Sequence, residues 1–134
     1  MANTGEPPPT DVFRVGGVTY LRIPAPEPRV SGAFYRAAFG WRIHDRGDGD
    51  VAFEDATGHV IGHFLPDLPV AGAAGILPYV SVADVDETLA AATANGGRIR
   101  EEPYPEGDLW VATVVDPAGN VVGLWQQGPR TTPG

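Results

Sequence analysis

A segment of ten residues occurs twice in this chain, and this internal repeat constrains the fold more than any other feature. Residues 55–64, with the sequence DATGHVIGHF, return 61 residues later as residues 116–125, with the sequence DPAGNVVGLW. A repeat of this kind indicates two copies of one supersecondary unit, which bury their apolar faces against each other. The sequence therefore predicts one domain built from two similar halves.

Size and composition support a single domain and exclude several classes of partner. A chain of 134 residues can bury one core but is too short for two independent domains of ordinary size. Its net charge of −8 opposes contact with phosphate backbones and anionic lipids, so we expect no nucleic-acid and no membrane partner. The chain has no cysteine, no visible signal peptide and no apolar run that could span a bilayer. These features favour a cytoplasmic protein.

The first half predicts the order strand, helix, strand, strand, strand. Residues 18–23 alternate in the period of a half-buried strand, and Pro28 can open a helix that Gly40 ends. Three further strands, separated by Gly- and Asp-rich turns, are predicted at 41–45, 51–54 and 59–65.

The second half predicts the same order after a Pro- and Gly-containing linker at 66–75. Asp84, with Glu87 three residues later, forms a capping box for a helix that ends at Asn95-Gly96-Gly97. The strands of this half are predicted at 76–82, 98–101, 110–115 and 121–126, with a loop at 102–108. The fold class is thus α+β, with βαβββ modules at 15–65 and 76–127 and disordered tails at 1–14 and 128–134. We expect a curved mixed sheet with a concave cleft and the helices on the outside.

Two motifs give this pattern a family resemblance. The sequence FYRAAFGW at 34–41 ends the first predicted helix, and DPAGN at 116–120 precedes the last predicted strand. Together with the paired βαβββ order, they resemble the vicinal oxygen chelate superfamily, which includes glyoxalase I, extradiol dioxygenases and bleomycin-resistance proteins. The resemblance covers roughly residues 16–127. It predicts the fold well and the function poorly, because one fold hosts many chemistries.

The resemblance implies four metal-ligand positions, and this chain lacks suitable donors there. Alignment on the motifs places Tyr20, Gly62, Leu77 and Gly123 at those positions. Three of the four have no donor atom in the side chain, and a lone phenol is a poor ligand for zinc, iron or manganese. His59 and His63 do not replace them, because residues four apart on a strand are separated by about 13 Å. We therefore expect a member of the superfamily without metal or other cofactor.

Aromatic side chains and one arginine are predicted to lie in the cleft instead. If the register of the superfamily holds, Tyr20, Arg22 and Tyr79 project into the cleft, and Gly62 and Gly123 leave its floor open. The side chains expected beside them are Phe64, Leu77, Trp110 and Trp125. Such a cleft suits a planar organic ligand with an acidic or carbonyl oxygen. The alternative is that these aromatics only fill the space between the modules or a dimer interface.

Candidates for acid or base catalysis are few. Most carboxylates fall in turns, and only Glu101, Glu102 and Tyr20 are candidate catalytic residues. Asp55 and Asp116 occupy the same position of the repeat, which indicates turn formation, because aspartate side chains bond nearby backbone amides there. The chain contains no Ser/His/Asp set and no phosphate-binding loop.

Three hypotheses of function follow. The first is a metal-free homodimer that binds an aromatic or natural-product ligand without transforming it, similar to the drug-sequestering members of the superfamily. The second is a lyase or isomerase that acts on a small oxygenated substrate. The third is an accessory protein without a ligand. The sequence leaves open the identity of the ligand and whether the modules pair within one chain or between two.

Overall fold

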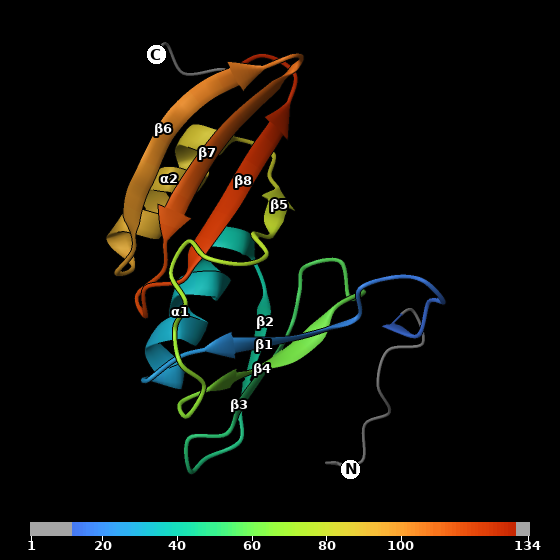
Figure 1. The fold of residues 1–134 in the computed structure, drawn as a ribbon, viewed down its shortest axis with the longest axis vertical. Coiled ribbons are helices and arrows are strands. Elements are labelled where there is room, and N and C mark those ends of the chain that lie inside the picture. The colour runs from blue at the N-terminus through green and yellow to red at the C-terminus, as the bar shows by residue number, and fades with distance from the viewer. Residues whose placement is uncertain (1–11, 131–134) are drawn as a thin grey trace.

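The computed structural model describes residues 12–130 and shows two modules with the same order of elements (Figure 1). Residues 1–11 of the expected tail at 1–14, and residues 131–134 of the expected tail at 128–134, lie outside the described residues. The first module contains β1 (Tyr20–Pro24), α1 (Pro28–Phe39), β2 (Arg42–Asp45), β3 (Val51–Glu54) and β4 (Ile61–Leu65). The second contains β5 (Tyr79–Ser81), α2 (Val85–Ala94), β6 (Arg98–Glu106), β7 (Leu109–Val115) and β8 (Val121–Gln127). The α+β class and the paired βαβββ modules are confirmed.

Each module forms its own four-stranded mixed sheet. The strand orders are β1-β4-β3-β2 and β5-β8-β7-β6, so the two modules have the same topology. In each sheet the first strand pairs in parallel with the last, and the other pairings are antiparallel. As a result, β1 and β5 are edge strands of their sheets.

The helices begin and end where the local sequence requires. Pro28 stands at the start of α1, where its missing N–H costs no hydrogen bond, and Gly40 ends the helix with a left-handed φ of 72°. At α2 the Asp84 carboxylate accepts a hydrogen bond from the Glu87 N–H at 3.0 Å. This contact confirms the predicted N-cap. Neither helix is long and apolar enough to cross a bilayer, and the rest of the described chain offers no other candidate.

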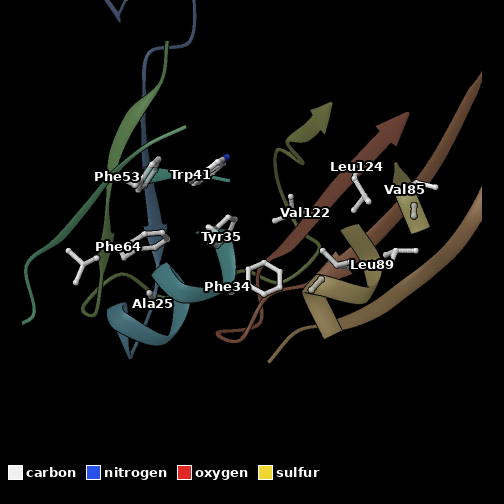
Figure 2. Close-up of a cluster of buried hydrophobic side chains, with 14 residues drawn as sticks. Ala25, Phe34, Tyr35, Trp41, Phe53, Phe64, Val85, Leu89, Val122 and Leu124 are labelled. Carbon is white, nitrogen blue, oxygen red and sulfur yellow. The ribbon is translucent and has the colours of Figure 1, made fainter. Parts of the chain in front are cut away.

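One core joins the two modules. Each sheet packs one face against its helix, and α1 and α2 contact each other. Figure 2 shows Phe34 and Tyr35 of α1 near the middle of this core, with residues of the first sheet on one side and residues of α2 and β8 on the other. The stacked rings of Tyr35, Trp41 and Phe53 fill the first module, with centroid distances of 4.7 and 4.8 Å. The faces of the sheets turned away from the helices are called the outer faces below. Neither helix covers them, although Val111 and Thr113 of β7 are buried on the outer face of the second sheet.

Two hydrogen bonds fix the modules to each other next to this core. The Tyr35 hydroxyl donates to Oδ2 of the buried Asp116 at 2.8 Å, and Nδ2 of Asn120 donates to the Pro24 carbonyl at 2.7 Å. Asp116 and Asn120 both belong to the turn between β7 and β8. This turn therefore positions the end of β1.

Several strand limits differ from those that the sequence predicts. β5 contains only residues 79–81 of the predicted 76–82, because Pro78 lies just before it and cannot donate a ladder hydrogen bond. β6 extends to Glu106 through the predicted loop, because it forms a long hairpin with β7. The pairing of the two strands shifts register at two places. β4 begins at Ile61, because the preceding turn continues to Val60.

The equivalence of Gly62 and Gly123, inferred from the repeat, is wrong. The first turn closes with a hydrogen bond from Asp55 N–H to Val60, and the second with one from Asp116 N–H to Asn120, one residue earlier. Beyond the turns, β4 and β8 are therefore offset by 60 residues, and His63 is the equivalent of Gly123. A slip of one residue moves every side chain of a strand to the opposite face. Gly62 accordingly faces the core beneath Phe53, and Gly123 lies on the outer face beneath Tyr79.

Candidate functional site

A cavity of about 740 Å³ lies between the two modules. Its walls come from β1, β5, the start of β8 and the end of α1, together with the turn at 55–60 and the segment at 71–78. Most of its lining is apolar, and its main apolar side chains are Leu21, Ile23, Tyr35, Trp41, Val80 and Val122. A cavity of this size and character is typical of sites for small organic molecules.

A few polar groups border the cavity at defined positions. The Asn120 side chain is held by its hydrogen bonds to Pro24 and to Asp116, and the Asp55 carboxylate accepts hydrogen bonds from the Thr57 hydroxyl and the Val60 N–H. Arg22 also borders the cavity, and among residues 12–130 its guanidinium has no ion-pair partner. The cavity can therefore offer an unpaired positive charge to a ligand.

The outer face of the first sheet carries a chain of polar side chains beside the cavity. The Tyr20 hydroxyl lies 2.7 Å from Nδ1 of His63, and Nε2 of His63 lies 3.5 Å from Oδ1 of Asp50. Arg22 is directly paired with His63 in the register of β1 and β4 and shares this face. This arrangement orients the Tyr20 ring, but Tyr20 does not border the cavity.

The outer face of the second sheet is more aromatic. The Tyr79 ring lies over Gly123, and its centroid is 5.8 Å from that of Trp125. Further along this face, partial burial and the nearby Glu101 carboxylate raise the pKa of Tyr104. The rings of Tyr79 and Trp125 are each about two-fifths exposed, at 41% and 39%.

The structure brings together only part of the predicted ligand-binding set. Arg22 and Tyr79 border the cavity, and Leu77 is half-buried between two residues that do, Ile76 and Pro78. Tyr20, Gly123 and Trp125 lie on the outer faces, outside the cavity.

The expected positions of Phe64, Trp110 and Gly62 in the cleft are corrected by the structure. Phe64 is only 1% exposed and packs in the core against Tyr35 and Phe53, on the face that carries Gly62. Trp110 lies on the helix side of the second sheet, where the Arg130 guanidinium stacks on its ring at 4.9 Å. All three point toward the helices because the strand register sets them on that face.

The candidate catalytic carboxylates lie away from the cavity. Glu101 accepts a hydrogen bond from the Thr113 hydroxyl at 3.0 Å and lies 3.6 Å from the Arg100 guanidinium, whereas Glu102 is exposed. The carboxylate that does border the cavity is Asp55, which the sequence assigned only to a turn. Its hydrogen bonds to Thr57 and Val60 confirm that turn role, as the bonds to the amides of residues 118–120 do for Asp116.

Sequence reasoning missed the aromatic floor of the cavity. Tyr35, Phe39 and Trp41 border it, although they belong to the motif at 34–41 that indicated the fold. The motif contains more aromatic residues than the apolar face of an amphipathic helix needs. This excess was the available sign that some of them line a cavity.

The donor set does not fit the metal that the superfamily commonly holds. The corrected register offers His63 in place of Gly62, beside Tyr20, but the second sheet still contributes only Leu77 and Gly123. Residues 12–130 contain no group of three or more His, Asp or Glu side chains that could hold a metal ion. One imidazole and one phenol are too few donors for a transition-metal site.

Comparison with known families agrees with this architecture. Residues 17–124 match the model of the glyoxalase/bleomycin resistance protein/dioxygenase superfamily. The chain belongs to this superfamily. No functionally curated protein matches its sequence.

Solved structures of several other proteins have the same fold. A glyoxalase/bleomycin resistance protein/dioxygenase family enzyme from Burkholderia phytofirmans PsJN is 21% identical, with a TM-score of 0.67 over 81% of this chain and 97% of that chain. TnmS3, an antibiotic binding protein from Streptomyces sp. CB03234, is 20% identical, with a TM-score of 0.63 over 87% of this chain and 99% of that chain. TioX from Micromonospora sp. ML1 is 19% identical, with a TM-score of 0.60 over 84% and 99%. At these identities the similarity shows that the present chain has the same fold, and it does not identify a ligand.

Proposed function

We propose that this superfamily member binds a small, largely apolar organic molecule with an acidic or carbonyl oxygen, without a metal ion. The observation that carries the proposal is the cavity of about 740 Å³, which is lined by aromatic and aliphatic side chains and bordered by the exposed Arg22. Burial of apolar ligand surface supplies affinity, and a charge-assisted hydrogen bond from Arg22 supplies orientation. TnmS3, which shares the fold, is an antibiotic binding protein, so this fold can hold a small organic molecule.

Binding without turnover is favoured over catalysis by the polar groups of the cavity. Asp55 and Asn120 are each engaged in hydrogen bonds that hold turns in place. Glu101 and Glu102, the carboxylates that could act as acids or bases, do not border the cavity. Asp55 is the carboxylate that a ligand there would meet, and its Oδ1 already accepts the two hydrogen bonds of its turn.

The test uses anilinonaphthalene sulfonate, an aromatic probe with one anionic group, measured by isothermal titration calorimetry. We expect saturable binding with one site per chain. Arg22→Gln should weaken it about tenfold, because a hydrogen bond to a charged group contributes about 1.5 kcal/mol. Arg98→Gln is the matched control, since Arg98 is an exposed strand arginine outside the cavity.

A second variant separates the cavity from the rest of the surface. Ser81→Phe places a large ring at the exposed edge that borders the cavity and should abolish binding. Unaltered affinity in both Arg22→Gln and Ser81→Phe, or no saturable binding to the parent protein, would contradict the proposal. A native mass spectrum of protein purified from its own source would then give the mass of the natural ligand.

A further inference from the structure

The two edge strands β1 and β5 both border the cavity. β1 pairs only with β4, and β5 pairs only with β8, so each has one edge without a neighbouring strand. Residues from both strands are among the walls of the cavity, including Arg22 on β1 and Tyr79 and Ser81 on β5. The free backbone edges of β1 and β5 therefore lie at the cavity, together with the side chains of these strands.

The hydrogen bonds of β5 show which backbone groups are available. The Gly123 N–H donates to the Pro78 carbonyl, and the Val82 N–H donates to the Trp125 carbonyl. In a parallel ladder alternate residues of a strand bond to the neighbour, so the N–H and C=O of Tyr79 and Ser81 are directed to the free edge. Within residues 12–130 these groups have no hydrogen-bond partner. A free edge of this kind is a template for an added strand.

The same argument applies to β1. The Ile61 N–H donates to the Thr19 carbonyl, and the Ala25 N–H donates to the Leu65 carbonyl, so the odd-numbered residues of this segment face β4. The backbone of Arg22 is consequently directed to the free edge, next to its own unpaired guanidinium. The cavity thus combines backbone donors and acceptors, an apolar lining and one positive charge.

We propose that the ligand is an extended, amide-bearing molecule with an acidic end: a short peptide or a peptide-like small molecule. Its amide groups pair with the backbone of Tyr79 and Ser81, so that it extends the second sheet by one short strand. Its apolar side groups contact the aromatic lining, and its carboxylate binds Arg22. At about 3.3 Å per residue, the edge from Tyr79 to Ser81 matches about three ligand residues. This inference rests on the proposed function and names the chemical class of its ligand.

The test compares three versions of one probe, the tripeptide acetyl-Val-Leu-Ala. The parent peptide should bind saturably and shift the amide resonances of Tyr79 and Ser81 in a nitrogen-15 correlation spectrum. Methylation of the central amide nitrogen should weaken binding at least tenfold, because it removes the donor that pairs with the edge. Replacement of the terminal carboxylate by an amide should weaken binding to the parent protein but not to Arg22→Gln.

A pair of variants tests the role of the backbone in the protein. Ser81→Pro removes an N–H that takes no part in the sheet, and proline is tolerated on such an edge. Ser81→Ala also loses the hydroxyl but retains the N–H, and it sets the reference. Ser81→Pro should bind the tripeptide at least tenfold more weakly than Ser81→Ala, with the same unfolding midpoint to within a few degrees.

The outcomes separate this inference from the proposed function. Equal affinity for the tripeptide and its methylated form, or for Ser81→Pro and Ser81→Ala, would overturn the inference. If the aromatic probe binds but the tripeptide does not, the inference is also wrong and the proposed function stands. If neither binds, the proposed function itself fails. If Ser81→Pro dissociates a dimer, the edge serves self-association, which would also overturn the inference.

Discussion

Two glycines that look alike in the sequence perform different tasks. A Cβ on Gly62 would meet the Leu21 carbonyl and, at 2.5 Å, the ring of the buried Phe53. A Cβ on Gly123 would meet the ring of Tyr79, which is partly exposed and can move. Gly62 therefore permits close packing of strand and core, whereas Gly123 provides a seat for an aromatic ring.

Alanine at the two positions should separate these tasks. Gly62→Ala should lower the free energy of unfolding by about 2–3 kcal/mol, because neither neighbour can yield. Gly123→Ala should lower it by less than about 1 kcal/mol but should change the affinity for the aromatic probe, since Tyr79 borders the cavity. Urea denaturation and calorimetric titration measure the two effects. Equal losses of stability in the two variants would contradict this assignment.

Tyr35 makes stability sensitive to alkaline pH. Burial, and then the charge of Asp116 and the hydrogen bond to it, raises the pKa of Tyr35 well above its usual value. The folded state thus favours the neutral phenol, and this contribution is present below about pH 10 and lost as the pH rises further. Tyr35→Phe should cost about 1–2 kcal/mol at neutral pH and should reduce the loss of stability above about pH 10. Urea denaturation across this range is the measurement, and an identical alkaline slope in both proteins would refute the role of Tyr35.

Residue types in the sequence predicted the site less well than they predicted the fold. The register of the superfamily placed Arg22 and Tyr79 in the cleft, and both border the cavity. Their role in ligand binding stays a prediction. Phe64 and Trp110 were misplaced, because an aromatic side chain in a strand fits either face and only the register decides. The polar chain from Tyr20 through His63 to Asp50 joins residues distant in sequence, and composition gave no sign of it.

At the scale of elements, the two β-turns of the repeat are alike in sequence and unequal in structural importance. The buried Asp116 carboxylate accepts five hydrogen bonds, three from backbone amides and two from the side chains of Tyr35 and Asn120. The Asp55 carboxylate accepts two and is more exposed. Only the second turn also joins the modules.

Removal of each carboxylate should reveal this difference. Asp116→Ala should lower the free energy of unfolding by about 3 kcal/mol or more, because it leaves several buried donors without an acceptor. Asp55→Ala should cost about 1 kcal/mol, the usual effect of losing a turn or cap hydrogen bond near the surface. Urea denaturation of the two variants checks the prediction, and it fails if the exposed turn proves the more costly to break.

Element types were predictable where the local sequence decides them. Helix α2 follows from the capping box at Asp84, and α1 from Pro28 and Gly40, because these signals act within a few residues. The lengths of β5 and β6 were not predictable, since a strand extends as far as its partner allows. Pro103 and Pro105 in the β6 hairpin favoured a loop, yet β6 is an edge strand and can accommodate proline.

For the whole molecule, the outer faces of the two sheets carry several exposed apolar side chains. Tyr20, Tyr79 and Trp125 are 46%, 41% and 39% exposed there, and Val18 and Ile76, which precede β1 and β5, are more exposed. The Tyr79 and Trp125 rings contact each other, and exposed apolar patches mark association sites in many proteins. We therefore retain the homodimer as a proposal in which the outer faces of two copies meet.

Light scattering should give twice the chain mass of 14.1 kDa at micromolar concentration. Trp125→Lys should shift the protein to the monomer, because it places a charge in the apolar interface. Val30→Lys is the control, since Val30 is an exposed apolar residue on α1, away from the outer faces. A monomeric parent protein, or equal dissociation by both variants, would contradict the proposed interface.

The extra residue in the turn from Asp55 to Val60 also bears on how such duplicated proteins diverge. Because the length of one surface loop decides which residues of β4 face outward, a single-codon insertion or deletion there exchanges the whole set at once. Point mutations would need to change each side chain separately. The side chains that a module exposes thus depend on loop length as well as on strand sequence. An alignment of the two copies without a gap compares residues on opposite faces of their sheets.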